Sequence, residues 1–91
     1  MKKAIRLTLV GNLQSMYFKQ YIKENAEANN VRGFLRNLEG PKVEVFLEGN
    51  SEDVDNMIKV CSQSPKFATI RDVQQKEERL QDFKEFKVLK F

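Results

Sequence analysis

The chain has 91 residues, of which 41% are hydrophobic, so it can bury one compact core, and we expect a single domain over residues 1–91. The net charge of +3 arises from 16 basic and 13 acidic residues that are interspersed along the chain, a balance that favours small anions over nucleic acid as partners. With one cysteine and no histidine, the chain has no internal disulfide, no Cys/His zinc cluster and no histidine-based catalytic triad.

The N-terminal segment and the apolar runs indicate the cellular location of the protein. No apolar run is long enough to span a membrane, and the short apolar run after the basic start is interrupted by Arg6, which is typical of a strand and not of a secretion signal. We therefore expect a cytoplasmic monomer without a membrane or nucleic-acid partner.

The first elements follow from hydrophobic spacing. A period-two alternation predicts a strand that ends at Gly11, with three apolar side chains on one face: Ile5, Leu7 and Leu9. A helix is predicted from Tyr17 to about Asn29, because apolar residues recur at spacings of three and four: Phe18, Tyr21, Ile22 and Ala26. Asn29 and Asn30 are expected to end this helix, since asparagine tolerates the left-handed conformation.

A hairpin and a second helix come next. The strands over residues 31–38 and 43–49 are joined by a short turn, and the first of them places Asn37 on the same side as Leu35, where a core residue is expected. Asn50 or Ser51 can cap the second helix, whose apolar stripe has helical spacing: Val54, Met57, Ile58 and Cys61. Ser64 and Pro65 are predicted to stop it.

The last third of the chain is less regular. Residues 67–73 predict a fourth strand, in which Ala68 and Ile70 share a face that Val73 continues only through a bulge. Residues 74–81, QQKEERLQ, predict a solvated loop or a loose ribbon. The last strand is predicted from apolar residues interleaved with lysines that protect an exposed edge: Phe83, Phe86, Val88, Leu89 and Phe91, with Lys84, Lys87 and Lys90.

This order of elements predicts an α+β fold of the ferredoxin-like βαββαβ type, a sandwich with two helices on one face of an antiparallel sheet. RNA-binding modules, metal chaperones, regulatory domains and small hydrolases share this plan, so the fold alone does not choose a function.

Residues 10–19, VGNLQSMYFK, join the first strand to the first helix and include only one charged side chain, that of Lys19. Backbone N–H groups of such a loop, together with the unpaired donors and positive dipole of the first helical turn, can hold an oxyanion or a phosphate. The alternative is a plain strand-to-helix connection with a glycine at the bend.

Two motifs stand in order along the chain. The first is a Val-Gly pair followed by an apolar residue, a Gln, an apolar residue and a Phe: Val10, Gly11, Leu13, Gln14, Met16 and Phe18. The second leads from a Val and a Gly to an Asn: Val31, Gly33, Phe34, Leu35, Arg36 and Asn37. In this order and at this spacing they resemble the acylphosphatase family, and further positions fit its hairpin, fourth strand and last strand: Gly40, Val43, Glu44, Val45, Glu48, Gly49, Pro65, Ala68, Ile70, Val73, Phe86 and Val88.

The resemblance implies hydrolysis of carboxyl or carbamoyl phosphates without a metal, a cofactor or a covalent intermediate. Lys19 would neutralise the phosphoryl group, and the amide of Asn37 would orient the attacking water. The loop would cradle the phosphoryl oxygens with its backbone N–H groups, which makes these the implied phosphate-binding residues: Gly11, Leu13, Gln14, Ser15, Met16, Tyr17 and Phe18.

Two positions depart from the family pattern. Lys19 stands where the family has its catalytic Arg, and a lysine cannot make the planar bidentate contact with a phosphate. We therefore expect an impaired hydrolase or, as the alternative, a non-catalytic domain that binds an anion or a protein. Ser15 replaces a loop glycine, which matters if that residue needs a positive φ, although its hydroxyl could donate to the ligand or cap the helix.

Other interpretations of these residues remain open. Lys19 could be a solvated helix lysine, and Asn37 could be a strand-end amide bonded to a neighbouring turn. The sequence Arg32-Gly33-Phe34 begins like a motif of RNA-binding modules, but the further alternating aromatics that such a motif needs do not follow it.

Overall fold

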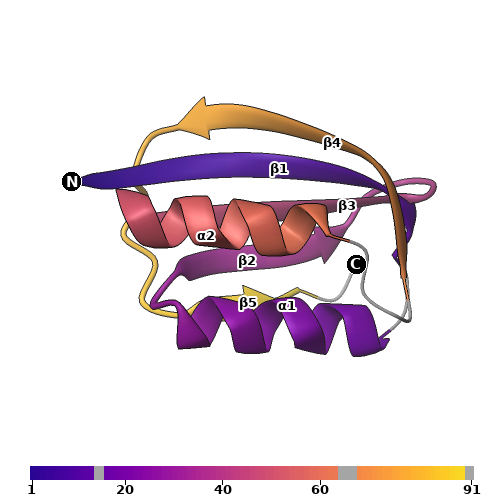
Figure 1. Cartoon of the computed structure of the whole chain (residues 1–91), viewed down its shortest axis with the longest axis horizontal. Helices are drawn as coiled ribbons and strands as arrows, with labels where there is room; N and C mark the ends of the chain where they lie inside the picture. The colour runs from indigo at the N-terminus through magenta and orange to yellow at the C-terminus, as the bar shows by residue number, and fades with distance from the viewer. Residues whose placement is uncertain (14–15, 64–67, 90–91) are drawn as a thin grey trace.

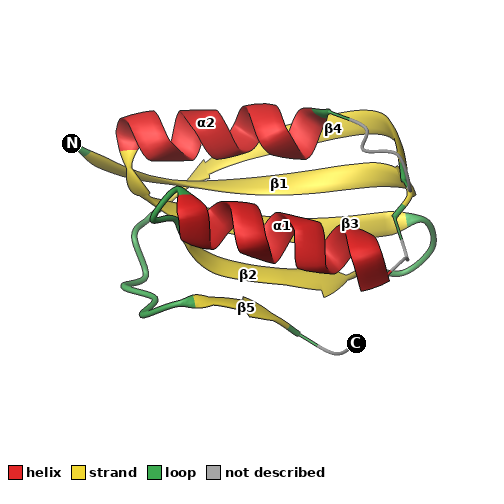
Figure 2. Cartoon of the chain, turned by 60° about the horizontal axis from the view of Figure 1, so that its bottom comes forward, coloured by secondary structure: helices red, strands yellow, loops and turns green. Residues whose placement is uncertain are grey.

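The computed structural model describes residues 1–13, 16–63 and 68–89. The two helices cover one face of a five-stranded sheet, as Figure 1 and Figure 2 show from two sides. The elements, in chain order, are β1 (Lys2–Asn12), α1 (Met16–Ala28), β2 (Arg32–Asn37), β3 (Lys42–Asn50), α2 (Ser51–Ser62), β4 (Thr69–Glu78) and β5 (Phe86–Val88).

The strand order across the sheet is β4-β1-β3-β2-β5. The first four strands pair antiparallel, so the predicted ferredoxin-like α+β fold is confirmed. The fifth strand departs from the expected antiparallel pattern, because β5 lies parallel to β2 and the sheet is mixed. The chain returns from β4 around one end of the sheet and therefore enters β5 in the same direction as β2 (Figure 1).

The core lies between the sheet and the helices, where the predicted apolar positions are buried. The inward side chains of β1, Ile5, Leu7 and Leu9, are at most 4% exposed, and they meet the predicted stripes of both helices. Cys61 on α2 is fully buried, and burial raises the pKa of its thiol to about 12. It is an unreactive core residue, as the sequence indicates.

The helix ends also agree with the sequence. Asn30, two residues after the end of α1, adopts the left-handed conformation with φ of 58°, and the N–H of Val31 then donates to the carbonyl of Ala26. Asn50 stands at the N-cap of α2, although its side chain makes no capping bond there. The predicted stop signal Ser64-Pro65 lies outside the described residues.

The prediction of a solvated loop or a loose ribbon over residues 74–81 is wrong for its first five residues, because β4 continues to Glu78 and pairs with β1 as far as Ala4. The reason is that β4 is an edge strand whose side chains here are mostly exposed, so no apolar alternation marks it. Backbone pairing with the long β1 holds it in place, and Glu78 adds an ion pair with Arg6 at 3.3 Å.

The predicted bulge in the fourth strand is confirmed. Val10 pairs with Asp72 whereas Gly11 pairs with Ile70, so Arg71 is the extra residue. Gly11 has φ of +156°, and a Cβ added there would lie 2.0 Å from the carbonyl oxygen of Thr69. Only glycine fits this close approach of β1 and β4.

The face of the sheet away from the helices carries charge and aromatic rings. Glu44, only 6% exposed, pairs with Arg6 at 2.7 Å and with Arg36. The rings of Phe34 and Phe46 stack, with centroids 5.6 Å apart, so these two aromatics flank the sheet. Phe18 and Phe86 pack in the core instead, and Phe67 lies outside the described residues.

Replacing Glu44 with Gln should lower the free energy of unfolding by roughly 1–3 kcal/mol at pH 7. Burial raises the pKa of the Glu44 carboxyl, but its hydrogen bonds and charge interactions with Arg6 and Arg36 outweigh burial and lower that pKa below its ordinary 4.5. The stabilisation is therefore present above pH 4.5 and is lost as the pH falls through the lowered value.

Urea unfolding of both proteins between pH 7 and pH 3 measures this effect. Glu77→Gln, on the exposed edge strand, is the control and should change the unfolding free energy by less than about 0.5 kcal/mol. A difference between wild type and Glu44→Gln that stays constant down to pH 3 would contradict the expectation.

Candidate functional site

A cavity of about 440 Å³ opens between the start of α1, the end of β2 and the residues that end and follow β5. It is lined by Met16, Lys19, Gln20, Lys23, Asn37, Val88 and Leu89. The structure therefore brings together Lys19 and Asn37, the two residues predicted to be catalytic, although 18 positions separate them in the sequence.

Lys19 sits in the first turn of α1, where the fully buried side chain of Phe18 anchors the helix on the core. The lysine is half-buried and pairs with no carboxylate among the described residues. Lys23 follows one helical turn later and lines the same cavity. Because the described lining includes two cations and no acidic side chain, the cavity favours an anion.

Asn37 is the last residue of β2 and is half-buried, on the same face as the buried Leu35. Its Oδ1 atom is buried and accepts no hydrogen bond from any residue in the described part of the chain. A buried acceptor left without a donor costs about 1–3 kcal/mol, so native proteins keep few of them. This carboxamide is free to accept a hydrogen bond from a ligand or a water in the cavity.

Apart from Gly11, the predicted phosphate-binding residues fall into three groups. Leu13 and Phe18 are fully buried, so their side chains anchor the two ends of the loop in the core. Met16 and Tyr17 are 83% and 74% exposed, and only Met16 of the two lines the cavity. Gln14 and Ser15 lie outside the described residues. Any contact of Leu13 or Phe18 with a phosphate would therefore use the backbone.

Gly11 stands apart from this cavity. Its N–H donates to the carbonyl of Pro41 at 2.9 Å, which leaves this donor engaged within the protein. With Asn12, Pro41, Thr69 and Arg71, it instead lines a second hollow of about 380 Å³. Gly11 therefore has a structural role: it permits the close approach of β1 and β4 described above.

Four lining residues were not predicted from the sequence: Gln20, Lys23, Val88 and Leu89. Lys23 could have been found, because it stands four positions after Lys19 and thus on the same side of the helix. Val88 and Leu89 could not, since only the pairing of β5 with β2 places them there.

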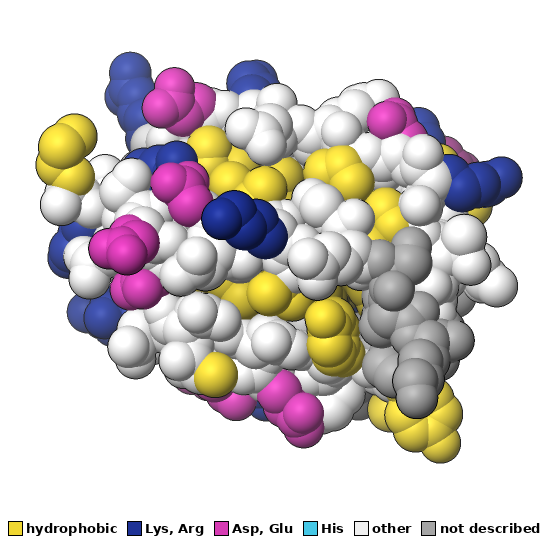
Figure 3. Space-filling model, in the orientation of Figure 1, with side chains coloured by type: hydrophobic (Ala, Val, Ile, Leu, Met, Phe, Trp, Pro, Cys, Tyr) yellow, Lys and Arg dark blue, Asp and Glu magenta, His cyan; other side chains and the backbone are white. Residues whose placement is uncertain are grey.

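The wider chemistry of the chain is limited. Within residues 1–13, 16–63 and 68–89, no three His, Cys, Asp or Glu side chains are grouped so that they could hold a metal ion. In the same ranges no helix has the length and apolarity to cross a membrane. Basic and acidic side chains are interspersed over the face that Figure 3 presents, without one basic block.

Known proteins resemble this chain in sequence and in fold. The family model described as Acylphosphatase matches residues 5–88. An acylphosphatase of Nitrosococcus oceani is 32% identical over 88 residues, covering 97% of this chain and 99% of that protein. One from Pyrobaculum aerophilum is 37% identical over 81 residues, covering 87% and 85%. The crystal structure of the Bacillus subtilis acylphosphatase superposes with a TM-score of 0.89 over 98% of this chain and 99% of that one, at 20% identity, which shows the shared fold.

We expect inorganic phosphate to bind in the cavity, and Lys19→Gln should weaken that binding by about tenfold, since one charge-assisted contact is lost. A titration followed by amide NMR shifts measures the affinity and should move signals at the start of α1. Lys59→Gln, on the exposed side of α2, is the matched control and should leave the affinity within about twofold. Equal affinities of wild type and Lys19→Gln would contradict a role for this lysine in anion binding.

Proposed function

Because the chain belongs to the acylphosphatase family, we propose that it hydrolyses carboxyl or carbamoyl phosphates in the cavity between α1 and β2. Family membership supports an acylphosphatase-like function. The observation that carries the assignment to this cavity is the buried Oδ1 of Asn37, which accepts no hydrogen bond from a described residue and lies in a cavity that Lys19 also lines.

Asn37 would orient the attacking water. Its Oδ1 accepts one O–H of the water, which directs a lone pair of the water oxygen at the phosphorus. The new P–O bond forms as the bond between phosphorus and the acyl oxygen breaks, and the carboxylate leaves with the electron pair. The proton of the water passes to the product phosphate or to solvent. Since the carboxylate is a good leaving group, positioning can drive the reaction without a strong general base.

Lys19 would stabilise the negative charge on the phosphoryl oxygens. An ammonium supplies a point charge, whereas the arginine of the family supplies a planar fork that binds two oxygens at once. Lys23 adds a second positive charge on the same side of the cavity. Loss of one well-placed donor typically costs on the order of 10²- to 10³-fold in rate, and the retained charge reduces this loss. We therefore expect slow turnover.

The alternative is a domain that binds a phosphate-like anion or a protein without turnover. The engaged N–H of Gly11 favours it, because one donor of the implied cradle is then not free to stabilise the charge that develops in the transition state. Both functions use the same cavity, so only turnover separates them. The cytoplasmic location, the monomeric state, the single domain and the lack of metal, membrane and nucleic-acid partners stay predictions from the sequence.

We expect wild-type protein to hydrolyse benzoyl phosphate slowly but above the rate in buffer. Lys19→Arg should raise kcat/KM by about 10- to 100-fold, because it restores the bidentate contact. Asn37→Ala should reduce the rate to that of buffer, since the water is no longer oriented. A spectrophotometric assay of benzoyl phosphate measures all three proteins.

Lys23→Arg is the matched control, because Lys23 lines the same cavity from the next turn of α1. It should leave kcat/KM within about threefold of wild type. An equal gain from Lys23→Arg would show that the gain does not depend on a guanidinium fork at position 19. If wild type and Lys19→Arg both bind phosphate without turnover, the non-catalytic alternative holds.

A further inference from the structure

The segment that joins β4 to β5 ties together the two edges of the sheet. Residues 79–85, which we call the strap, leave β4 at one edge and reach β5 at the other by passing around the end of the sheet (Figure 1, Figure 2). β5 has only three residues and pairs with β2 alone. Its position therefore depends on the buried ring of Phe86 and on how the strap is held.

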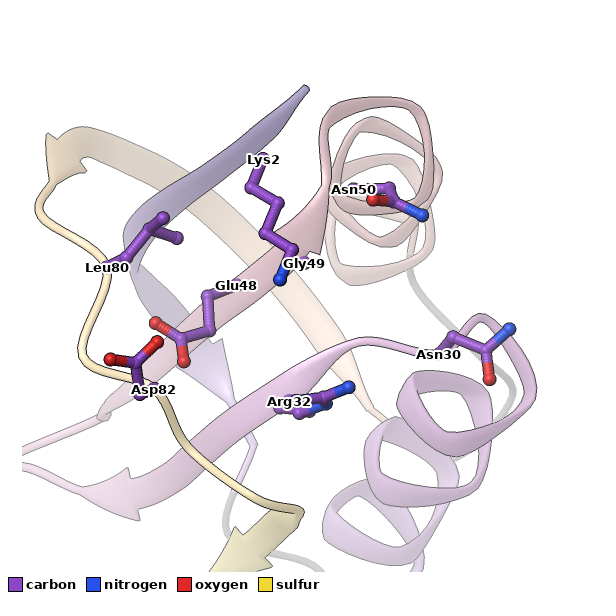
Figure 4. Close-up of a pocket in the computed structure, with 8 residues that line it drawn as sticks. All are labelled: Lys2, Asn30, Arg32, Glu48, Gly49, Asn50, Leu80 and Asp82. Carbon is purple, nitrogen blue, oxygen red and sulfur yellow. The ribbon is translucent and has the colours of Figure 1, made fainter.

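Glu48 holds the strap. This residue of β3 is 4% exposed, and its carboxylate points to the strap beside Asp82 (Figure 4). One carboxylate oxygen accepts the N–H of Gln81 at 2.7 Å, and the other accepts the N–H of Phe83 at 2.6 Å. Asp82, between these two donors, has φ of 59°, a conformation that a non-glycine residue keeps only when its surroundings impose it.

Further contacts of the strap surround this clamp. The ring of Phe83 packs against Phe34 and Phe46, with centroids 5.7 and 5.5 Å away. Arg32 donates to the carbonyl of Phe83 at 3.4 Å, and the N–H of Gly33 donates to the carbonyl of Glu85 at 3.2 Å. Most of these groups are neutral or exposed, whereas the two bonds to the buried carboxylate are charge-assisted and are the strongest of the set.

The strap leads directly into the wall of the candidate cavity. β5 starts at Phe86, immediately after the strap, and the N–H of Leu89 donates to the carbonyl of Leu35 at 2.8 Å. Val88 and Leu89 then line the cavity on the side that carries no charge, whereas Lys19 and Asn37 are held by α1 and β2. A change in the strap would thus move the apolar wall and leave the polar residues in place.

We infer that Glu48 is a positioning residue for this wall: by clamping the strap it holds Val88 and Leu89 where the acyl group of the substrate packs. The inference rests on the proposed function, since it takes the cavity as the substrate site. It assigns the phosphoryl group to the polar side of the cavity and an apolar acyl group to the side formed by β5. Glu48 lies beside Arg32, the first residue of β2, and thus at the end of that strand opposite to the cavity.

Glu48→Gln tests the clamp. The glutamine side chain presents an NH₂ group to one of the two backbone N–H donors, so at most one of the two bonds survives. Glu44→Gln is the matched control, because Glu44 lies on the same face of β3, is similarly buried and binds Arg6 and Arg36 without touching the strap. Phe83→Ala removes the ring contacts of the strap with the sheet and serves as the second variant if Glu48→Gln does not fold.

Two measurements read out the effect. Hydrogen exchange should be at least about tenfold faster over residues 79–89 in Glu48→Gln than in Glu44→Gln, because the strap opens locally. Affinity for benzoylphosphonate, an unreactive analogue with an apolar group, should fall on the order of tenfold, whereas affinity for inorganic phosphate should change less than about twofold. A loss of folded protein alone would reduce binding of the two ligands equally.

Equal hydrogen exchange over residues 79–89 in Glu48→Gln and Glu44→Gln would overturn the inference. An equal loss of affinity for benzoylphosphonate and for phosphate would also overturn it. So would a wild-type protein that binds benzoylphosphonate no better than phosphate, because the wall would then contact no acyl group. If Glu48→Gln selectively loses affinity for benzoylphosphonate but the wild-type protein shows no turnover, the positioning role of Glu48 is supported and only the proposed hydrolysis is contradicted. Failure of the two proposals can therefore be told apart.

Discussion

Backbone pairing of β1 with β3 on one side and β4 on the other is the constraint on which the rest of the structure depends. The pairing runs along nearly the whole of β1, from Lys2 to Asn12, and so fixes the point where the chain turns into α1. Gly11 permits the close approach of β4 at that end. Since β3 also carries β2, the same ladder brings the end of β2 beside the first turn of α1, where Lys19 and Asn37 share a cavity.

Three buried or half-buried polar side chains on β2 and β3 differ in how they are satisfied. Glu44 has two arginine partners, and Glu48 has two backbone donors, so both carboxylates are accommodated within the protein. The Oδ1 of Asn37 has no such donor among the described residues. The Oδ1 of Asn37 therefore lowers the stability of a protein whose buried carboxylates are fully hydrogen-bonded. Such a cost is typical of a polar group that is retained to bind a ligand.

The proposed chemistry depends on position more than on reactivity. In the proposed reaction, the lysine charges on one side of the cavity would hold the phosphoryl group, and the aliphatic side chains on the other side would hold its acyl group. The resemblance implies that Lys19 stands where the family has an arginine; a lysine retains the charge and lacks the fork, so we expect a slower reaction in an unchanged fold. In the proposed role, Glu48 holds the wall formed by Val88 and Leu89 through the strap. The residues on which substrate binding depends then lie at both ends of the sheet.

The sequence by itself determined the elements whose side chains alternate between core and solvent: β1, both helices, the hairpin, and even the bulge near Val73. It also pointed to Lys19 and Asn37, because their motifs keep the spacing of a family. Only the tertiary structure decided that β4 reaches Glu78, that β5 is parallel to β2, and that Val88 and Leu89 line the cavity. The physical reason is that these features rest on backbone hydrogen bonds between distant segments, and such bonds leave no pattern in the side chains of either partner.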